Sequence, residues 1–468
     1  MLNTVFRKTQ KFHFIGIGGI GMCGIAELLK DWGFEVTGSD MNSSENTRRL
    51  ESLGITTTIG HRRENVPDCD VVVYSSAVQA DNPERLAALE RKIPVIRRAE
   101  MLGEIFKLKP TRIAISGTHG KTTTTSMIGQ IFIEAGTDPI IIAGGIVGTL
   151  GTTTRSGKGN VIIAEADEFD RSFLKLYPTD TVITTIEAEH LDCYDNLEDI
   201  EKTFTQFANE TPFFGSIVAC IDEKSVRKIL PNLKKPAVTV GLDADADIRA
   251  DRIVMGKGES SFDVIIQNKL FGRIRLFVPG IHNVKNALAA IGVAWKNDVG
   301  FEAISNGLSK FRGVRRRFEI VEENDFFMLV DDYGHHPTEI RATLNAAKTG
   351  WNRRIVAVFQ PHLFTRTRDF YEDFASALML ADVAVILDVY PSREKPIEGI
   401  TGKIVADAAV RLGHPAVYYV EDKTRVPEVV ESIAQKGDMI ISLGAGDVNR
   451  FHPEFLKRLS KKFERNER

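Results

Sequence analysis

Residues 112–125 read RIAISGTHGKTTTT: a short β-branched run, a glycine-containing loop, then Lys121 and a row of threonines. This order predicts a buried strand, a tight loop and the first turn of a helix. In such a loop, backbone N–H groups surround phosphate oxygens, the lysine adds positive charge and the following hydroxyl can bind Mg²⁺. The stretch departs from the full P-loop pattern because Ile115 stands five residues before Gly120, where that pattern has glycine. We therefore predict a triphosphate-binding loop between Gly117 and Thr123.

A second glycine-rich turn lies near the start of the chain, where residues 16–21 read GIGGIG. The turn follows the strand-like run HFIGI and precedes a helical pattern over about residues 22–32. Such a turn brings backbone N–H groups and the positive end of a helix against a diphosphate, and Asp40, 19 positions after Gly21, suits a ribose hydroxyl. By itself the pattern is typical of an NAD site, and a purely structural tight turn is the alternative.

Acidic residues and a histidine follow the next two expected strands. Glu165 ends the run VIIA at the start of EADEFD, and His190 comes shortly after the run VITTI. The carboxyl ends of neighbouring parallel strands meet at one edge of an open α/β sheet. We therefore expect Glu165, His190 and the Thr122 hydroxyl to hold one or two Mg²⁺ ions. We expect the other acids of EADEFD to be solvated, and a structural or capping role is the alternative for His190.

Short β-branched runs recur along the chain, each followed by a turn and then by helical periodicity, which predicts an α/β architecture with parallel sheets. Alternation in SFDVIIQ and GRIRLFV predicts an antiparallel portion within residues 247–278. The clearest predicted strands are residues 13–17, 112–116, 161–164, 182–185, 355–359, 383–387 and 439–443.

Two composition shifts suggest where domains meet. Pro110 biases Lys109 away from helix just before the run RIAIS, and a second boundary is expected after the basic cluster near residue 318. The sequence therefore predicts three domains, residues 1–108, 109–320 and 321–468, which agrees with a length of 468 residues at roughly 150 residues per domain.

The composition is that of an ordinary globular protein, with 43% hydrophobic residues, 26% charged residues and a formal net charge of -3. This balance excludes a nucleic-acid coat, a disordered tail and a small disulfide-stapled module. The four cysteines stand at least 27 positions apart and not at zinc-ligand spacing. Because no long apolar stretch or signal-peptide pattern is visible, we expect a cytoplasmic protein with no membrane partner and no nucleic-acid partner.

Taken together, the motifs resemble the Mur ligase superfamily, ATP-dependent amide-forming enzymes of peptidoglycan precursor synthesis and cell wall biogenesis. The resemblance implies a Rossmann-like N-terminal domain for a UDP sugar, a central P-loop-type ATPase, and a Rossmann-like C-terminal domain that closes over the site. It runs the length of the chain and rests on these motifs in this order: FIGIGGIGMCGIAELL, YSSAV with NPE, GTHGKTTTT, EADEFD, IEAEHLD, PGIHNVKNALAA, FRGVRRRFE, DDYGHHPTEI, QPHLFTRTRDF and SLGAGD.

Within the superfamily, the pattern is most similar to members that join L-alanine to the lactyl carboxylate of UDP-N-acetylmuramate through an acyl phosphate, releasing ADP and phosphate. This implies ATP and Mg²⁺ as cofactors and small molecules as the partners; monomer and homodimer both stay open. The nearest alternative is a sister ligase that adds a preformed peptide to the same sugar nucleotide. An NAD-dependent dehydrogenase would leave GTHGKT, Glu165 and His190 unexplained, and a non-catalytic nucleotide switch would need no UDP sugar.

The resemblance also assigns residues to each substrate. It implies that Lys121, Glu165, His190 and Arg317 are catalytic, that Arg317 faces the γ-phosphate, and that Thr122, Glu165 and His190 bind the metal. The implied UDP-sugar residues are Gly16, Gly18, Gly19, Gly21, Asp40, Ser75, Ser76 and Ala77. The implied ATP residues are Gly117, Thr118, His119, Gly120, Lys121, Thr122, Thr123, Asn283, Asn286, Arg317 and Asp332, with Asn283 and Asn286 facing the adenine and Asp332 contacting the ribose. The implied amino-acid pocket consists of Tyr333, His335, His336, His362 and Arg366.

Three positions depart from the superfamily pattern. Leu363 stands where an arginine commonly follows the histidine of QPH, so Arg366 carries the amino-acid carboxylate alone or with help from Arg368. Thr185 replaces an asparagine, and Glu189 replaces the aspartate before His190. The last two changes affect the surroundings of the metal residues and leave Glu165 and His190 themselves in place.

Overall fold

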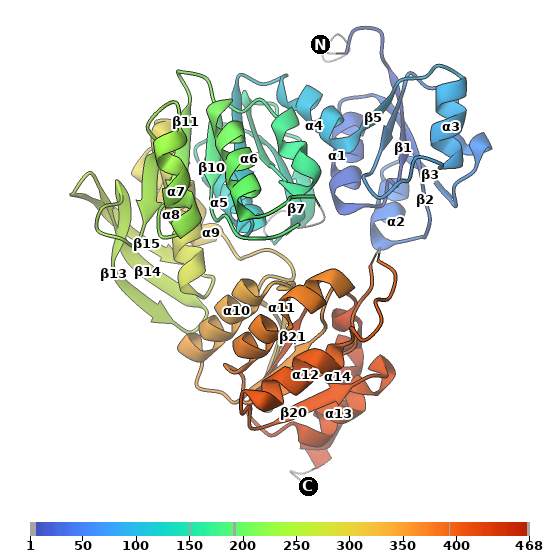
Figure 1. Cartoon of the computed structure of the whole chain (residues 1–468). Coiled ribbons are helices and arrows are strands. Elements are labelled where there is room, and N and C mark those ends of the chain that lie inside the picture. The colour runs from blue at the N-terminus through green and yellow to red at the C-terminus, as the bar shows by residue number, and fades with distance from the viewer. Residues whose placement is uncertain (1–5, 149–150, 191–192, 393, 466–468) are drawn as a thin grey trace. The chain divides into compact units, whose positions relative to one another are not determined.

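The computed structural model describes residues 6–148, 151–190, 193–392 and 394–465, and it contains three β-sheets flanked by helices (Figure 1). Contacts divide the chain into two compact units, each considered by itself below. Unit 1 comprises Met1–Ile253, Phe262–Arg275 and Val284–Arg312. Unit 2 comprises Val254–Ser261, Leu276–Asn283 and Gly313–Arg468.

The first sheet is parallel and has the order β3-β2-β1-β4-β5. Its centre is β1, whose Phe12, Phe14 and Ile15 are buried because helices cover both faces of a parallel sheet. The elements are β1 Lys11–Ile15, α1 Ile20–Asp31, β2 Glu35–Asp40, α2 Glu45–Ser52, β3 Thr56–Ile59, β4 Val71–Tyr74, α3 Pro83–Glu90, β5 Val95–Arg97 and α4 Arg98–Phe106.

The second sheet has ten strands in the order β15-β14-β13-β12-β11-β10-β6-β9-β7-β8. Strands β9 and β10 lie parallel to β6 on its two sides. The strands are β6 Thr111–Ser116, β7 Ile140–Val147, β8 Thr152–Arg155, β9 Val161–Glu165, β10 Asp180–Ile183, β11 Ser216–Cys220, β12 Val238–Gly241, β13 Ile248–Gly256, β14 Glu259–Ile266 and β15 Lys269–Leu276. The helices are α5 Lys121–Glu134, the 3-10 segment η3 Phe169–Lys175, α6 Leu197–Asn209, α7 Lys224–Ile229, α8 Ile281–Lys296 and α9 Phe301–Lys310.

The third sheet has the order β16-β17-β21-β18-β19-β20, with β16 antiparallel to β17 and the remaining pairs parallel. The strands are β16 Glu319–Glu323, β17 Phe327–Asp332, β18 Ile355–Phe359, β19 Val383–Leu387, β20 Val417–Val420 and β21 Asp438–Leu443. The helices are α10 Pro337–Gly350, α11 Phe364–Leu378, α12 Gly402–Arg411, α13 Val426–Ile433 and α14 His452–Arg465.

These sheets confirm the predicted α/β architecture, and each predicted strand corresponds to an observed one within two residues. The predicted antiparallel portion is the meander β13–β14–β15, since turns of two residues between consecutive neighbouring strands reverse the chain. The domain boundaries near residues 108 and 320 stay predictions. In the described ranges, no helix combines the length and the apolar character needed to cross a lipid bilayer.

Helix α5 forms in spite of a run of threonines that has low intrinsic helix propensity. Thr124 and Thr125 are fully buried, because α5 packs against α9 on one side and against β7 and β9 on the other. Close approach to α9 depends on Gly307, where a side chain would meet the backbone of Ile131. Burial of the whole helix therefore overrides local propensity and fixes the loop at its N-terminus.

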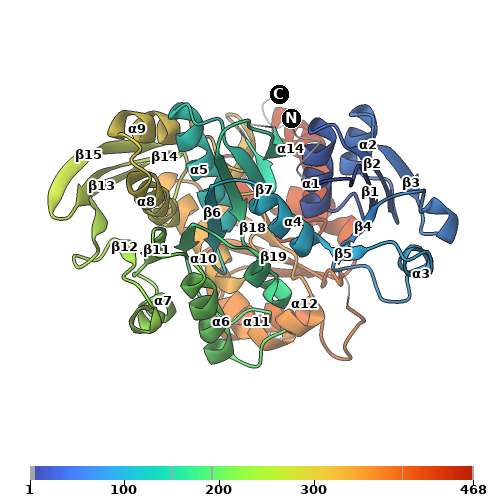
Figure 2. The same cartoon turned by 90° about the horizontal axis from the view of Figure 1, so that it is seen from above.

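Helices α1 and α4 join the first two sheets within unit 1. Figure 2 shows α1 beside β7; α1 contacts β7 and β8, and α4 contacts η3. Gly24 of α1 touches Thr154 of β8 so closely that any side chain on Gly24 would overlap it. Arg49 of α2 donates a hydrogen bond to Thr152 at 2.6 Å across the same junction and another to Glu27 of α1 at 2.8 Å. The two glycine-rich loops therefore belong to one packed body.

A buried carboxylate of helix α3 lies against the first sheet. Glu84 is fully buried, and its oxygens form hydrogen bonds of 2.8–3.0 Å with His13, Ser39, His61 and Asn65. Burial by itself raises the pKa of Glu84, but these four hydrogen bonds outweigh burial and hold the pKa below its ordinary value. Because the charged form is favoured in the folded chain, it stabilises the fold at pH values above the unfolded pKa.

We predict that Glu84→Gln lowers the local stability of β1 and β2 by about 1–3 kcal/mol at pH 7, because the amide presents N–H groups to hydrogen-bond donors. In the folded chain the pKa of Glu84 lies below 4.5, its ordinary value. The stability that the charged carboxylate contributes is therefore lost as the pH falls through this lower pKa. Native-state hydrogen exchange of β1 amides measures the effect. The matched control is Glu90→Gln, whose partner Arg63 lies on the surface. Equal exchange in both variants at pH 7 would contradict the prediction.

Candidate active site

The loop between β6 and α5 has the geometry of a phosphate-binding loop. Gly120 adopts a φ of 83°, and an added Cβ there would lie 2.5 Å from the Asn286 side-chain oxygen. Gly117 also has positive φ, at 137°. Glycine is therefore required at Gly120 both by backbone conformation and by the close approach of Asn286. The helix α5 begins at Lys121, so its first N–H groups point toward the loop.

Lys121 is held inside this loop. Its Nζ donates to the carbonyl oxygens of Gly117 at 2.6 Å and Thr118 at 3.2 Å, and to both carboxylate oxygens of Glu168 at 3.0 and 2.9 Å. Burial alone lowers the pKa of Lys121, but the adjacent Glu168 charge raises it above its ordinary value. The ammonium therefore stays charged and is oriented toward the loop.

Glu165 and Thr122 meet as the sequence predicts. Glu165 ends β9 beside Ile115 of β6, and its carboxylate accepts the Gly144 N–H at 2.5 Å. Burial is the main reason that the pKa of Glu165 is raised, and hydrogen bonds from Gly144 and Thr122 oppose that shift. A carboxylate and a hydroxyl thus lie together at the carboxyl end of the strands, and both are ligand types that Mg²⁺ favours.

His190 lies nearest to a different acid. Its Nε2 is 3.9 Å from Glu168 Oε1, and side-chain atoms of Asp167, Glu168 and His190 lie within 4.8 Å of one another. The expectation that the other acids of EADEFD are solvated is wrong for Glu168, which is only 2% exposed. Its burial follows from the turn into η3, where Tyr194 donates a hydrogen bond to the Glu168 carbonyl at 2.6 Å. Glu168 is therefore a site residue that sequence reasoning missed.

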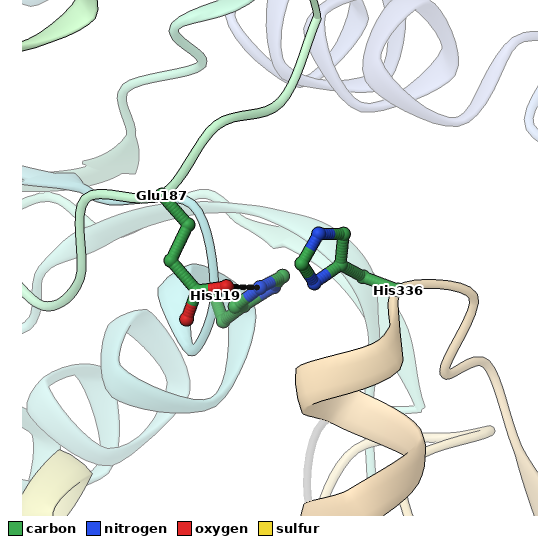
Figure 3. Close-up of side chains that lie close together, drawn as sticks. All are labelled: His119, Glu187 and His336. Carbon is green, nitrogen blue, oxygen red and sulfur yellow. Dashed lines mark ion pairs between the residues drawn. The ribbon is translucent and has the colours of Figure 1, made fainter. Parts of the chain in front are cut away.

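The loop after β10 supports the phosphate loop from the other side. Thr185 accepts the His119 N–H on its hydroxyl at 2.8 Å and the Thr118 N–H on its carbonyl at 2.9 Å. Figure 3 shows Glu187 directed at the His119 ring, with 3.6 Å between Glu187 Oε2 and His119 Nε2. Thr185, a departure from the superfamily pattern, thus holds the backbone of the loop in place.

The first glycine-rich turn, Gly16 to Gly21, leads from β1 into α1. Asp40, at the end of β2, accepts the Gly18 N–H at 2.9 Å, so this carboxylate bonds the turn itself. Ser75 lies beside Gly16, 3.2 Å from the position of an added Cβ. The structure therefore brings together the turn, the end of β2 and the loop after β4, as expected for residues of one ligand site.

Arg98, at the start of α4, is a second residue that sequence reasoning missed. An added Cβ at Gly21 would lie 3.0 Å from Arg98 Nη1, and Arg98 Nη2 is 3.8 Å from Asp167. A small cavity beside Arg98 is also lined by Leu102, Glu165 and Asp167. The guanidinium therefore lies between the first turn and the acids at the end of β9. The doublet Arg97–Arg98 before an apolar helix was the available sequence signal.

Unit 2 contains Arg317, Asp332 and the residues assigned to the amino-acid pocket. Arg317 donates a hydrogen bond to Glu339 at 2.8 Å. Burial lowers the pKa of Arg317, but the Glu339 and Asp332 charges raise it by more, so the pKa lies above its ordinary value. Asp332 accepts N–H groups of Phe318 at 2.8 Å and Gly334 at 2.7 Å, and burial raises its pKa to about 6. Both oxygens of Asp332, the residue that the resemblance assigns to the ribose of ATP, therefore already accept hydrogen bonds from backbone N–H groups.

The residues assigned to the amino-acid pocket follow β17 and β18. The His335 and His362 rings lie 5.8 Å apart between centroids, and Arg366 Nη1 is 3.3 Å from His362 Nδ1. His336 is the N-cap residue of α10 and accepts the Thr338 N–H at 3.4 Å. Arg366 is 8% exposed, so its guanidinium is a buried cation next to the His362 imidazole.

The predicted adenine residues have separate surroundings. Asn283 donates from Nδ2 to the Pro279 carbonyl at 2.7 Å in unit 2. Asn286, in unit 1, lies against Gly120 as described above. Their role toward adenine stays a prediction, whereas the contact between Asn286 and the phosphate loop is a feature of the fold.

A triphosphate-type loop and a second glycine-rich turn occur in one α/β chain, with carboxylates and a histidine after the strands that flank the loop. These features are typical of a nucleotide-dependent enzyme. Family models match the chain in three segments: Mur ligase family, catalytic domain (residues 11–110), Mur ligase middle domain (115–294) and Mur ligase, glutamate ligase domain (316–446). The chain belongs to the Mur ligase family, and the resemblance seen in its motifs is confirmed.

Several named relatives align with this chain over nearly its full length. The UDP-N-acetylmuramate--L-alanine ligase of Geotalea uraniireducens is 49% identical over 95% of this chain and 97% of its own, and that of Geobacter sulfurreducens is 48% identical over 97% and 99%. The solved UDP-N-acetylmuramate-alanine ligase of Thermotoga maritima aligns with a TM-score of 0.83 at 30% identity, covering 96% of this chain and 99% of that one. A murein peptide ligase of Psychrobacter arcticus aligns at 0.71 with 24% identity, covering 96% and 98%, and shares the fold.

We predict that Gly120→Ala weakens ATP binding about tenfold or more, because the added methyl displaces Asn286 and the loop backbone. Titration calorimetry with ATP and Mg²⁺ measures the change. The matched control is Gly136→Ala, which also has positive φ, at 72°, but has open space around the added Cβ. Both variants lose similar backbone stability, so equal ATP affinity in the two would show that the close approach at Gly120 is irrelevant to binding.

Proposed function

We propose that the protein is an ADP-forming ligase that joins L-alanine to the lactyl carboxylate of UDP-N-acetylmuramate at the expense of ATP. The observation that carries the proposal is the coexistence of two nucleotide loops in one packed unit, one beside Arg98 and one containing Lys121. Full-length relatives at 48–49% identity that carry this enzyme name support it. We further propose that the reaction takes place in the cytoplasm.

The chemistry requires activation of the acid. A carboxylate does not condense with an amine in water, so the lactyl carboxylate must be activated first. Its oxygen attacks the γ-phosphorus of ATP, the bond to the bridging oxygen breaks, ADP leaves and an acyl phosphate is formed. Lys121 stabilises the negative charge that builds up on the phosphoryl oxygens, and we assign the same role to Arg317. The L-alanine amine then attacks the acyl carbon, releasing phosphate and forming the amide. Holding the reactants in register contributes on the order of 7–11 kcal/mol.

We assign Mg²⁺ to the end of β9. The donors there are the Thr122 hydroxyl, the Glu165 carboxylate and the cluster of Asp167, Glu168 and His190, an oxygen-rich set that suits a hard cation. Bound there, the ion supplies neutralisation of phosphate charge. The chain's own contribution is to hold these groups fixed: Gly144 orients Glu165, and Lys121 is bonded to Glu168.

The sister-ligase alternative has weaker support. The relatives of 48–49% identity are named UDP-N-acetylmuramate--L-alanine ligases. The murein peptide ligase structure is only 24% identical, so it supports a shared fold and no shared substrate. In unit 2, the pocket candidates Arg366 and His362 form a compact cation and imidazole pair that suits one amino-acid carboxylate.

We predict that phosphate release requires UDP-N-acetylmuramate, L-alanine and ATP together, because the acyl phosphate forms only on the sugar nucleotide. A coupled phosphate assay with each substrate omitted in turn tests this. L-Ala-containing tripeptide in place of L-alanine tests the sister ligase. Full-rate ATP consumption without the sugar nucleotide would refute the proposal, and activity with the tripeptide alone would favour the alternative.

We also predict that Lys121→Ala lowers the rate of ADP release by about 10²–10³-fold, since the loop loses its fixed cation. The dissociation constant of UDP-N-acetylmuramate stays within about twofold of wild type, which is about 0.4 kcal/mol, because the first turn has its own contacts. Steady-state ADP release and calorimetry measure the two effects. Lys107→Ala, which removes a half-exposed lysine paired with Glu104, is the control and keeps the full rate. An unchanged rate in Lys121→Ala would remove Lys121 from the mechanism.

A further inference from the structure

Four aromatic rings form a continuous row at the carboxyl ends of three strands in the third sheet. Tyr333 and His335 follow β17, His362 follows β18 and Tyr390 follows β19. Successive ring centroids lie 5.2, 5.8 and 5.9 Å apart, and the last pair, His362 and Tyr390, is stacked with an interplanar angle of 13°. Tyr390 is thus the last ring of a row whose other three members, Tyr333, His335 and His362, are assigned to the amino-acid pocket.

The backbone fixes the stacked pair in place. His362 and Tyr390 form a parallel β-bridge; the Leu363 N–H donates to the Tyr390 carbonyl at 3.0 Å and the Tyr390 N–H to the Pro361 carbonyl at 2.8 Å. Leu363 adopts a φ of 71°, which is unfavourable for a residue with a side chain. These hydrogen bonds hold the unfavourable conformation, and with it the direction of both rings.

The Tyr390 ring also has a rigid backing. Gly446, in the loop after β21, touches Tyr390 so closely that an added Cβ would lie 2.7 Å from Tyr390 Cγ. The Gln360 side chain fixes that loop by accepting the N–H groups of Asp447 at 2.9 Å and Val448 at 3.1 Å. Tyr390 therefore cannot retreat toward Gly446 without moving this loop.

The positive charge next to the row of rings indicates which chemical group of a ligand the row contacts. Arg366 is buried, and its guanidinium lies 3.3 Å from the Nδ1 atom of His362, the ring on which Tyr390 stacks. A guanidinium recognises a carboxylate, and a flat ring beside it contacts whatever group the α-carbon of the bound acid carries. A ring that cannot retreat sets an upper limit on the size of that group.

We propose that Tyr390 is a specificity-determining residue that restricts the acceptor to L-amino acids with a methyl-sized side chain. The inference rests on the proposed function, in which Arg366 and His362 bind the acceptor. The ring, and not the phenol hydroxyl, does the selecting. Removing the ring opens space for one or more additional methylene groups, and pushing the ring forward from Gly446 closes space for the methyl group itself.

The test compares kcat/KM for L-alanine and L-2-aminobutyrate, which differ by one methylene group. A pocket that excludes one methylene discriminates about 10–200-fold. Tyr390→Ala is expected to reduce the wild-type ratio about tenfold or more and to raise the KM for L-alanine, with the KM values of ATP and UDP-N-acetylmuramate within about twofold. Tyr390→Phe keeps the wild-type ratio, since the ring remains. Tyr418→Ala, an exposed tyrosine on β20, is the matched control and changes neither value.

A second variant keeps the test decisive if Tyr390→Ala does not fold. Gly446→Ala places a methyl group 2.7 Å from Tyr390 Cγ and still closer to Gln360 Oε1, so it displaces the ring together with the amide that fixes this loop. We expect it to raise the KM for L-alanine and to shift the preference toward glycine. An unchanged L-alanine to L-2-aminobutyrate ratio in Tyr390→Ala, at any overall rate, overturns the inference, as does an unchanged glycine preference in a folded Gly446→Ala. A wild-type protein that does not ligate L-alanine refutes the proposed function and the inference with it. If the wild-type protein ligates L-alanine but both variants keep the wild-type ratios, the inference is refuted and the proposed function is not.

Discussion

The parallel pairing of β6 with β9 and β10 is the constraint on which the phosphate site depends. In this register Ile115 faces Glu165 on one side and Ser116 faces Ile183 on the other, so the loops that follow the three strands leave the sheet at one level. Residues far apart in the chain therefore meet beside Lys121 without any long connection. Burial of α5 then prevents the loop from moving away from the two strands that supply its acidic and histidine neighbours.

Buried charge at this edge is balanced by local pairing. Lys121 has Glu168 as its counter-ion, and two loop carbonyls complete its hydrogen bonds. A buried ammonium without such partners would be strongly destabilised, and the same holds for Glu168 without Lys121. The arrangement keeps a full positive charge at a loop built to receive anionic oxygens, and a phosphate approaching the loop meets donors that are already oriented.

Much of this could be predicted because the signal is local. A strand, a glycine loop and a helix start are contiguous in 112–125, and the parallel topology follows from alternating strand and helix patterns. Glu165 was found because it ends a strand. Glu168 was expected in solvent, because its burial depends on η3 and on Lys121, 47 positions away. Arg98 and Tyr390 were not predicted, for the same reason. Arg98 is singled out by its contact with Gly21 and Tyr390 by its contact with His362, and no local sequence pattern encodes either contact.

Leu363 illustrates what such contacts demand of the chain. Its backbone lies in a region that glycine would occupy without strain, and a residue so held typically costs about 1–3 kcal/mol. Exchange for glycine would relieve that strain, yet it would also free the segment that orients His362. At this position, backbone strain favours glycine, whereas the rigidity of the neighbouring aromatic surface favours a residue with a side chain. Glycine would also leave a void, because the Leu363 side chain is only 9% exposed, so packing and ring orientation both act against the relief of strain.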